Sequence, residues 1–133
     1  MNEIHARERV GGLPGCRVRR VTQYVEQNLQ RRLRLAELSA LVHMSPYHFA
    51  RMFKHTTGVP PHLFVIRRRI EQARALLATQ RAPIAVVARL VGFQTPSHFT
   101  TTFRRLTGMT PSEYRSGVGV PSADRSRDAE AAS

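Results

Sequence analysis

The sequence predicts an all-α fold, and three features support that prediction. Between residues 16 and 116, apolar residues recur at the three- and four-residue spacing of amphipathic helices, and strand-like alternation is almost absent. Ser45-Pro46 and Thr95-Pro96 are typical helix starts, because a capping hydroxyl precedes proline at the first helical position. Gly58 and Gly108 follow these starts at the same distance and are typical helix stops.

Each helix is predicted from its own local pattern. In the first half, Val18, Val21, Val25 and Leu29 form one apolar stripe. In the second half, a long apolar stripe runs from Pro61 to Thr79. Leu35, within the second predicted helix, and Leu106, near the end of the sixth, are expected to face inward. The predicted helices cover residues 17–28, 35–42, 45–58, 61–79, 83–91, 95–108 and 111–115.

The two ends of the chain have a different composition. Residues 1–16 combine charges with glycine and proline, and residues 117–133 are rich in Gly, Pro, Ser, Ala, Arg and Asp. Such segments bury too little apolar surface to offset the entropy of folding. We expect a flexible leader at residues 1–16 and a disordered tail at residues 117–133.

The charge of the chain favours a polyanionic partner. Of its 133 residues, 21 are Lys or Arg and nine are Asp or Glu, which gives a net charge of +12 at pH 7. The excess is not confined to a tail, since residues 17–115 hold sixteen arginines, one lysine and four glutamates. Nucleic acid is the commonest partner of such a surface.

The composition argues against several other classes of protein. The length suits one or at most two small globular units, and neither paired carboxylates nor a glycine-rich phosphate loop is present, so we expect no enzyme. Cys16 is the single cysteine, which fits a reducing compartment. No apolar run is long enough to cross a membrane, and no signal peptide is visible. We expect a cytoplasmic protein that binds no membrane, metal or cofactor.

The chain contains an internal repeat. Residues 35–44 align with 84–93, and residues 46–64 align with 96–114, with ten identical pairs among twenty-nine. Each copy has a short helix, a tight turn and a proline-started helix. Ser39 and Ala88 are the matching small residues where the second helix must approach the first closely. This plan is the helix-turn-helix pattern.

The outer face of the second helix in the first copy carries groups that can read DNA. If Phe49 and Phe53 point inward, Tyr47, Arg51 and Lys54 lie on the opposite side with Ala50 beside them. Arg51 can donate two hydrogen bonds to guanine O6 and N7, which is worth about 1 to 3 kcal/mol of discrimination.

The corresponding face of the second copy is less charged. It carries Ser97, Thr101 and Arg104, flanked by Thr100 and Arg105. Hydroxyl groups make single hydrogen bonds to bases or touch a thymine methyl. We therefore expect the first copy to supply more of the base-specific energy.

These residues resemble the AraC/XylS family of transcription regulators over about residues 18–115. The long helix contributes Pro61, Phe64, Arg69-Ile70, Ala73 and Leu76-Leu77. The second copy carries most of the resemblance, through Ile84, Val87-Ala88, Leu90, Gly92-Phe93, Ser97-His98-Phe99, Phe103-Arg104, Gly108, Thr110-Pro111 and Tyr114-Arg115.

The resemblance implies seven helices that form two homeodomain-like helix-turn-helix units joined by a long helix. It implies a DNA-binding domain at residues 17–116, with a first helix-turn-helix at about 35–57, a linker helix at about 61–79 and a second helix-turn-helix at about 83–107. It also implies activation of transcription from asymmetric promoter sites. The positions implied to contact bases are Tyr47, Ala50 and Arg51 in the first unit and Ser97, Thr100 and Thr101 in the second.

Two residues depart from the family pattern. His43 stands where the turn usually has Gly, and Thr101 stands where many members have Arg. Most members also carry an effector-binding domain, for which this chain has no room. It therefore resembles the short, stand-alone type, or else a DNA-binding half of a longer protein.

The expected partner is double-stranded DNA, bound by a monomer on the bacterial nucleoid, with RNA polymerase as the candidate protein partner. Two recognition helices would enter major-groove segments about 34 Å apart. Bending the DNA to meet both would cost about 1 to 6 kcal/mol. The expected phosphate contacts are Arg31, Arg34, Lys54, Arg81, Arg104 and Arg105.

Two other functions stay open at this point. A nucleoid-type or RNA-binding protein would use the same charge without discriminating between sequences. A helix at residues 66–77, with an apolar stripe flanked by arginines, could instead bind a membrane surface or a protein.

Overall fold

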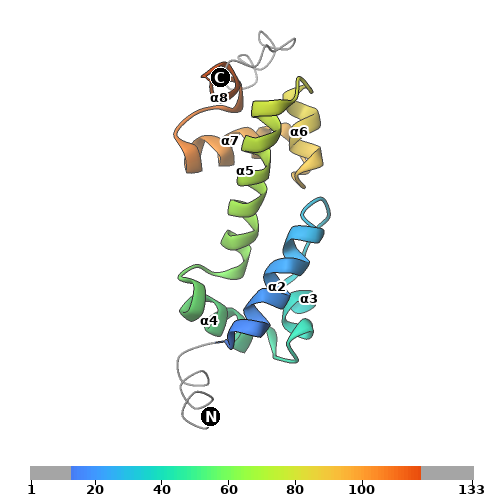
Figure 1. Cartoon of the computed structure of the whole chain (residues 1–133), viewed down its shortest axis with the longest axis vertical. Helices are drawn as coiled ribbons and strands as arrows, with labels where there is room; N and C mark the ends of the chain where they lie inside the picture. Colours follow the sequence, from blue (N-terminus) through green and yellow to red (C-terminus); the bar gives the residue numbers. More distant parts are fainter. Residues whose placement is uncertain (1–12, 118–133) are drawn as a thin grey trace. The chain divides into compact units, whose positions relative to one another are not determined.

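The computed structural model of the chain describes residues 13–117, and within that range it contains helices and no strand. The all-α prediction is therefore confirmed for the described part of the chain. Its seven helices are α2 (Gly15–Gln27), α3 (Leu35–Leu41), α4 (Pro46–Thr57), α5 (Pro61–Thr79), α6 (Ile84–Leu90), α7 (Pro96–Thr107) and α8 (Pro111–Gly117) (Figure 1). None of them is long and apolar enough to cross a membrane.

Most of the predicted leader and tail lies outside the described residues. The part that is described is ordered: α2 begins at Gly15, two residues earlier than predicted, and α8 extends to Gly117. Leu13 is buried, and its backbone N–H donates a hydrogen bond of 2.7 Å to Thr56 Oγ1 at the end of α4. The flexible leader predicted at residues 1–16 is therefore wrong for residues 13–16.

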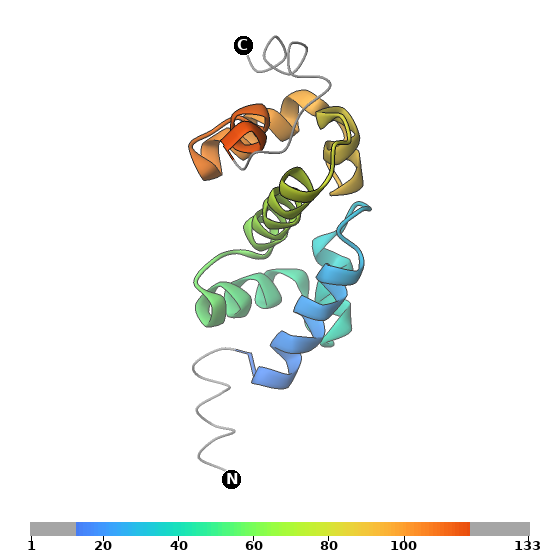
Figure 2. The same cartoon turned by 45° about the horizontal axis from the view of Figure 1, so that its top comes forward.

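The chain divides into two compact units, Met1–Ile66 and Arg67–Ser133, and the boundary lies within α5. In the first unit, α3 packs against both α2 and α4 (Figure 1). In the second unit, α7 packs against both α6 and α8 (Figure 2). Each unit thus contains one copy of the internal repeat as a pair of packed helices.

The second helix of each repeat starts at a matching cap. Ser45 Oγ accepts a hydrogen bond from the His48 backbone N–H at 3.3 Å, and Pro46 follows the cap. In the other copy, Thr95 Oγ1 accepts from the His98 backbone N–H at 3.1 Å. The hydroxyl satisfies one of the N–H groups that the first helical turn leaves without a partner.

The same two helices also end alike. Gly58 and Gly108 adopt φ of 88° and 84°, and each donates its N–H to the carbonyl four residues earlier at 2.8 Å. The left-handed conformation favours glycine at this position. Thr57 and Thr107 each donate a side-chain hydrogen bond of 2.8 Å to the carbonyl of a core phenylalanine.

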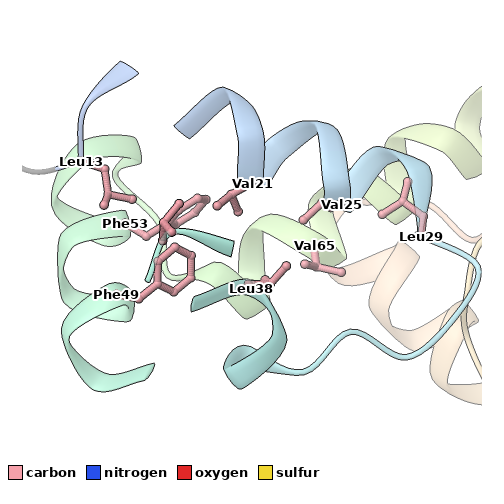
Figure 3. Packing of buried hydrophobic residues seen from close by; sticks show 9 residues of the cluster. Leu13, Val21, Val25, Leu29, Leu38, Phe49, Phe53 and Val65 are labelled. Carbon is pink, nitrogen blue, oxygen red and sulfur yellow. The ribbon is translucent and has the colours of Figure 1, made fainter. Parts of the chain in front are cut away.

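The core of the first unit is an aliphatic and aromatic cluster, which Figure 3 shows between α2, α3 and α4. Phe53 lies at its centre, with ring centroids 5.5 Å from Phe49 and 5.4 Å from Phe64. The inward stripe predicted for the first helix is confirmed at its buried members Val21, Val25 and Leu29. The full set of buried residues is Leu13, Val21, Val25, Leu29, Leu38, Val42, Phe49, Phe53 and Val65.

The core of the second unit repeats this arrangement. Phe99 lies 5.3 Å from Phe93 and 5.7 Å from Phe103, and Phe103 lies 5.7 Å from Tyr114 on α8. Arg115 is fully buried in this unit, which residue type alone would not predict. The buried apolar residues are Ile70, Ala73, Leu77, Ile84, Val87, Ala88, Val91, Phe93, Phe99 and Phe103.

Two leucines that the helical pattern places inward are exposed instead. Leu35 and Leu106 are each 38% exposed. Leu35 is the first residue of α3 and Leu106 lies in the last turn of α7, so each stripe runs past the part of the helix that a neighbour covers. A periodic pattern gives the direction of a side chain but not the length of the contact.

The tight turn within each repeat requires a left-handed residue. His43 has φ of 57°, and Gly92 in the matching position has φ of 101°. In both turns the following N–H bonds back to the small residue of the short helix, from Met44 to Ser39 at 3.1 Å and from Phe93 to Ala88 at 2.9 Å. Ser39 and Ala88, the small residues at which the sequence predicts a close approach of the second helix, are both buried.

Candidate nucleic-acid interface

The outward face of α4 presents an aromatic ring and a guanidinium group that touch each other. Tyr47 is 72% exposed, Arg51 and Lys54 are exposed, and Ala50 beside them is half-buried. The Arg51 guanidinium carbon lies 5.8 Å from the centroid of the Tyr47 ring. Residues four apart meet on one helix face, and an exposed cation–π pair contributes about 0.5 to 1 kcal/mol.

The outward face of α7 carries hydroxyl groups. Ser97, Thr101 and Arg104 are exposed, as the sequence predicts. Thr100 is not: only 8% of it is exposed, so it has little surface to offer to a base edge. The physical reason is the helical turn of 100° per residue, which places Thr100 next to Phe99 and three residues before Phe103, on the flank of the buried stripe. The expected base contact by Thr100 therefore does not fit the structure.

The two outward faces therefore differ in chemistry. The α4 face can offer a planar, charged, bidentate donor that is already in contact with an aromatic ring. The α7 face offers two exposed hydroxyls, from Ser97 and Thr101, which can each donate or accept a single hydrogen bond. The larger share of base-specific energy that the sequence predicts for the first copy stays a prediction.

Most of the expected phosphate-binding residues are exposed. Lys54 lies in the last turn of α4, and Arg104 and Arg105 lie in the last turn of α7. These cations also stabilise the negative ends of the helix dipoles, so they have a structural role in the free protein. Arg34 occupies the N-cap position of α3, and Arg81 lies between α5 and α6; both are exposed.

Arg31, by contrast, is held by other residues of the first unit. Its guanidinium group donates to both carboxylate oxygens of Glu37, to Asn28 Oδ1 at 3.1 Å and to the Tyr24 hydroxyl at 2.6 Å. The Tyr24 hydroxyl in turn donates to Glu37. A phosphate would have to compete with Glu37 for this guanidinium, so Arg31 is the weakest of the expected phosphate ligands.

This network shifts the ionisation of its members. Hydrogen bonds from Arg31 and then from Tyr24 lower the pKa of Glu37 from its ordinary 4.5 to about 2. The hydrogen bond to Glu37 raises the pKa of Tyr24, and the pKa of Arg31 rises through the same carboxylate. The sequence offers no signal for this network, because its three ionisable residues come from two helices and the segment between them.

Two further carboxylates of the described residues have structural partners. Glu71 binds Arg74 at 3.1 Å, and the Arg74 guanidinium carbon lies 5.5 Å from the centroid of the Tyr114 ring. Glu113 accepts from the Thr110 backbone N–H at 2.9 Å, while Thr110 Oγ1 accepts from the Glu113 N–H at 3.1 Å, a capping box that lowers the pKa of Glu113. Across residues 13–117, no three His, Cys, Asp or Glu side chains gather where they could hold a metal ion.

Comparison with known families places this geometry among transcription regulators. Residues 38–117 match a family described as a helix-turn-helix domain. The chain is 39% identical over 95 residues to the probable transcriptional regulator LumQ of Photobacterium leiognathi, covering 71% of this chain and 38% of that protein. It is 36% identical over 102 residues to the arabinose operon regulatory protein of Escherichia coli, covering 76% of this chain and 35% of that protein. The chain thus spans less than two fifths of the length of these relatives.

Solved structures agree with these matches. An AraC-type transcriptional regulator from Chromobacterium violaceum superposes with a TM-score of 0.73 at 26% identity, covering 79% of this chain and 94% of that one. The DNA-binding domain of the global transcriptional factor AdpA, solved in complex with a target DNA, gives a TM-score of 0.69 at 32% identity. The match covers 80% of this chain and 91% of the AdpA domain.

Proposed function

The chain belongs to the AraC family of helix-turn-helix, DNA-binding transcription regulators, and from this premise we propose that it binds an asymmetric promoter site as a monomer and activates transcription there. In this proposal α4 and α7 are the two recognition helices, and each enters a major-groove segment. RNA polymerase is the proposed protein partner, and the bacterial chromosome is the proposed place of action. The chain works by binding, without catalysis.

The observation that carries this proposal is the exposed pair of Tyr47 and Arg51 on α4. The fork of an arginine matches O6 and N7 of guanine in the major groove, and each such bidentate pair contributes about 1 to 3 kcal/mol of discrimination. Contact with the Tyr47 ring restricts the guanidinium before DNA arrives, which reduces the entropy lost on binding. Tyr47 itself can contact a neighbouring base through its ring or hydroxyl, and Ala50 can touch a thymine methyl.

The second recognition helix contributes weaker base contacts in this proposal. Ser97 and Thr101 are exposed and can make single hydrogen bonds, whereas the buried Thr100 supports the helix from within. General affinity comes from phosphate contacts by Arg34, Lys54 and Arg81, with Arg104 and Arg105 at the end of α7. If six to ten phosphates are contacted, a rise in salt from 50 to 200 mM should lower the affinity for DNA by about 10³- to 10⁵-fold.

Substitution of Arg51 tests the proposal. A cognate site is first selected from genomic fragments and footprinted, and binding is then measured on that duplex and on a scrambled duplex of equal length. Arg51→Ala is expected to weaken cognate binding by about 5- to 150-fold, as expected for 1 to 3 kcal/mol, and to change scrambled binding much less.

Arg51→Lys is the matched control, because it keeps the charge and removes the bidentate fork. It should retain binding to the scrambled duplex and lose most of the discrimination. Equal losses on both duplexes would reject base reading by Arg51. A wild-type chain that binds both duplexes equally would instead indicate a non-specific nucleic-acid-binding protein.

A further inference from the structure

The first unit carries further exposed basic residues, which lie at the start of α2 and at the end of α4, beyond the pair Tyr47 and Arg51. Arg17, Arg19 and Arg20 lie at the start of α2, and Lys54 and His55 lie in the last turn of α4. All five are exposed. We refer to these five residues as the basic corner.

A specific contact brings the two groups to one end of the unit. The Leu13 N–H donates to Thr56 Oγ1 at 2.7 Å, and Leu13 is buried. Figure 3 shows Leu13 packed beside Phe53 at this end of the core. Since α2 begins two residues after Leu13, the arginines lie within two helical turns of that contact, and Lys54 and His55 directly precede Thr56.

The charges of the basic corner are not compensated locally. Neither residues 13–25 nor residues 45–61 contain an Asp or Glu. Within the described part of the chain, Arg17, Arg19 and Arg20 form no ion pair, whereas Arg31 and Arg74 each pair with a glutamate. The basic corner therefore carries the charges of three arginines and one lysine, with no carboxylate in either of these two stretches of sequence.

The helix dipole gives Arg17 no stabilising role in the free protein. The start of a helix is the positive end of its dipole, so cations there reduce the stability of the helix. Lys54, in the last turn of α4, is favourable by the same rule. Arg17 lies in the first turn of α2, and Arg19 and Arg20 lie in the second. All three are exposed and form no ion pair within residues 13–117, so they suit an external polyanion.

We propose that the basic corner binds the phosphate backbone of the DNA that flanks the half-site read by α4. This inference rests on the proposed function, because it takes α4 as the recognition helix of the first unit. The three arginines of α2 add a contact that the reading faces do not supply, and they lengthen the footprint of the first unit beyond the bases that α4 can reach. The contact carries no sequence information, since every duplex has the same backbone.

The test compares wild type with the triple variant Arg17→Gln, Arg19→Gln, Arg20→Gln on two cognate duplexes. One extends well beyond the footprinted site, and the other is trimmed to the bases that α4 and α7 read. On the long duplex, the slope of log affinity against log salt should become shallower by about 0.9 for each phosphate that the variant no longer neutralises. On the trimmed duplex, the two proteins should have the same slope.

The controls separate this proposal from unfolding and from the proposed function. The charge-conserving variant Arg17→Lys, Arg19→Lys, Arg20→Lys should keep the wild-type slope, and the glutamine variant should unfold at the same temperature as wild type or higher. An unchanged slope on the long duplex would overturn the proposal, even if Arg51→Ala abolishes discrimination. The proposal would also be overturned if the glutamine variant keeps the DNA binding of wild type but loses binding to phosphatidylglycerol vesicles that wild type binds. That result would favour an anionic membrane surface as the partner.

Discussion

At the scale of single residues, the two tight turns of the repeat have the same left-handed backbone conformation at residues of different type. His43 and Gly92 both have positive φ, at 57° and 101°. For a residue with a Cβ, the left-handed region costs about 1 to 2 kcal/mol, while glycine enters it freely. The departure from glycine that the sequence shows at residue 43 is thus a source of strain in the first unit.

Replacement of His43 by glycine is expected to stabilise the protein by up to about 1 kcal/mol, because relief of the left-handed strain exceeds the extra entropy of an unfolded glycine. The midpoint of urea unfolding measures the effect. Gly92→Ala is the matched substitution and should destabilise by about 1 to 2 kcal/mol. A His43→Gly variant less stable than wild type would show that the imidazole makes a compensating contact.

Glu37 gives the stability of the first unit a dependence on pH. Its pKa is lowered from 4.5 to about 2 by Arg31 and Tyr24. A carboxyl group with a lowered pKa in the folded state stabilises the fold above its unfolded pKa, and that stabilisation is lost as the pH falls. We expect the contribution to be complete above pH 4.5 and to disappear between pH 4.5 and about 2.

The variant Glu37→Gln isolates this contribution from that of other acids. It should be less stable than wild type at pH 7, and the two unfolding midpoints should converge as the pH approaches 2. The same variant releases Arg31, so its binding to scrambled duplex should become stronger and more dependent on salt. A stability difference that stays constant from pH 7 to pH 2 would show that the ion pair is not its cause.

At the scale of elements, α4 and α7 are alike in their ends and different in their faces. Both begin with a hydroxyl cap and end at a left-handed glycine. Their outward faces carry Tyr47 and Arg51 in one helix and Ser97 and Thr101 in the other. The matching ends hold each helix in place, and the outward residues are therefore the part that can differ between the two units without cost to the fold.

The hydroxyl caps of α4 and α7 are expected to contribute similarly to the stability of the protein. Ser45→Ala and Thr95→Ala should each destabilise the protein by about 1 kcal/mol, since each leaves a first-turn N–H without its partner. Chemical denaturation followed by circular dichroism measures the loss. Ser116→Ala, an exposed serine within α8, is the control and should change stability by less than about 0.5 kcal/mol.

The contact between Tyr47 and Arg51 predicts a difference between two substitutions of the tyrosine. Tyr47→Ala should weaken binding to the cognate duplex by at least about two- to fivefold, because it removes the ring that holds the guanidinium. Tyr47→Phe keeps the ring and should retain the affinity that comes from the contact between the ring and the Arg51 guanidinium. If Tyr47→Phe binds as weakly as Tyr47→Ala, the hydroxyl and not the ring contact accounts for the affinity.

At the scale of the whole molecule, one chain carries two helix-turn-helix units, one on each side of the boundary within α5. A single chain of this kind can read two half-sites without forming a dimer. Because the two outward faces differ, the half-sites need not be related by symmetry. This is the basis for proposing an asymmetric site.

The spacing between half-sites provides the test of this proposal. Insertion of about five base pairs between them moves one half-site to the opposite face of the duplex and should reduce cognate affinity to that of the α4 half-site alone. Insertion of about ten base pairs restores the face but doubles the distance, and should be equally harmful to a monomer. Light scattering of the complex with the unaltered site should give one chain per duplex. Two chains per duplex would contradict the monomer.

Local sequence patterns were sufficient to predict the helical fold and the plan of the repeat. Helix starts and stops are local, since Ser45, Pro46 and Gly58 act on backbone groups within four residues of themselves. The long helix was predicted with its observed bounds, Pro61–Thr79, and the inward phenylalanines and the outward Tyr47 and Arg51 also followed from helical spacing.

Which side chains are buried and which charges form ion pairs became known from the folded arrangement of the helices. Thr100 is buried, Leu106 is exposed and Arg31 is bound by Glu37, although their positions in the sequence suggest otherwise. The same holds for Leu13, which sequence composition assigns to a flexible leader and the structure attaches to Thr56. Periodicity reports the direction of a side chain about its own helix axis, whereas burial and ion pairing depend on neighbours that are distant in the sequence.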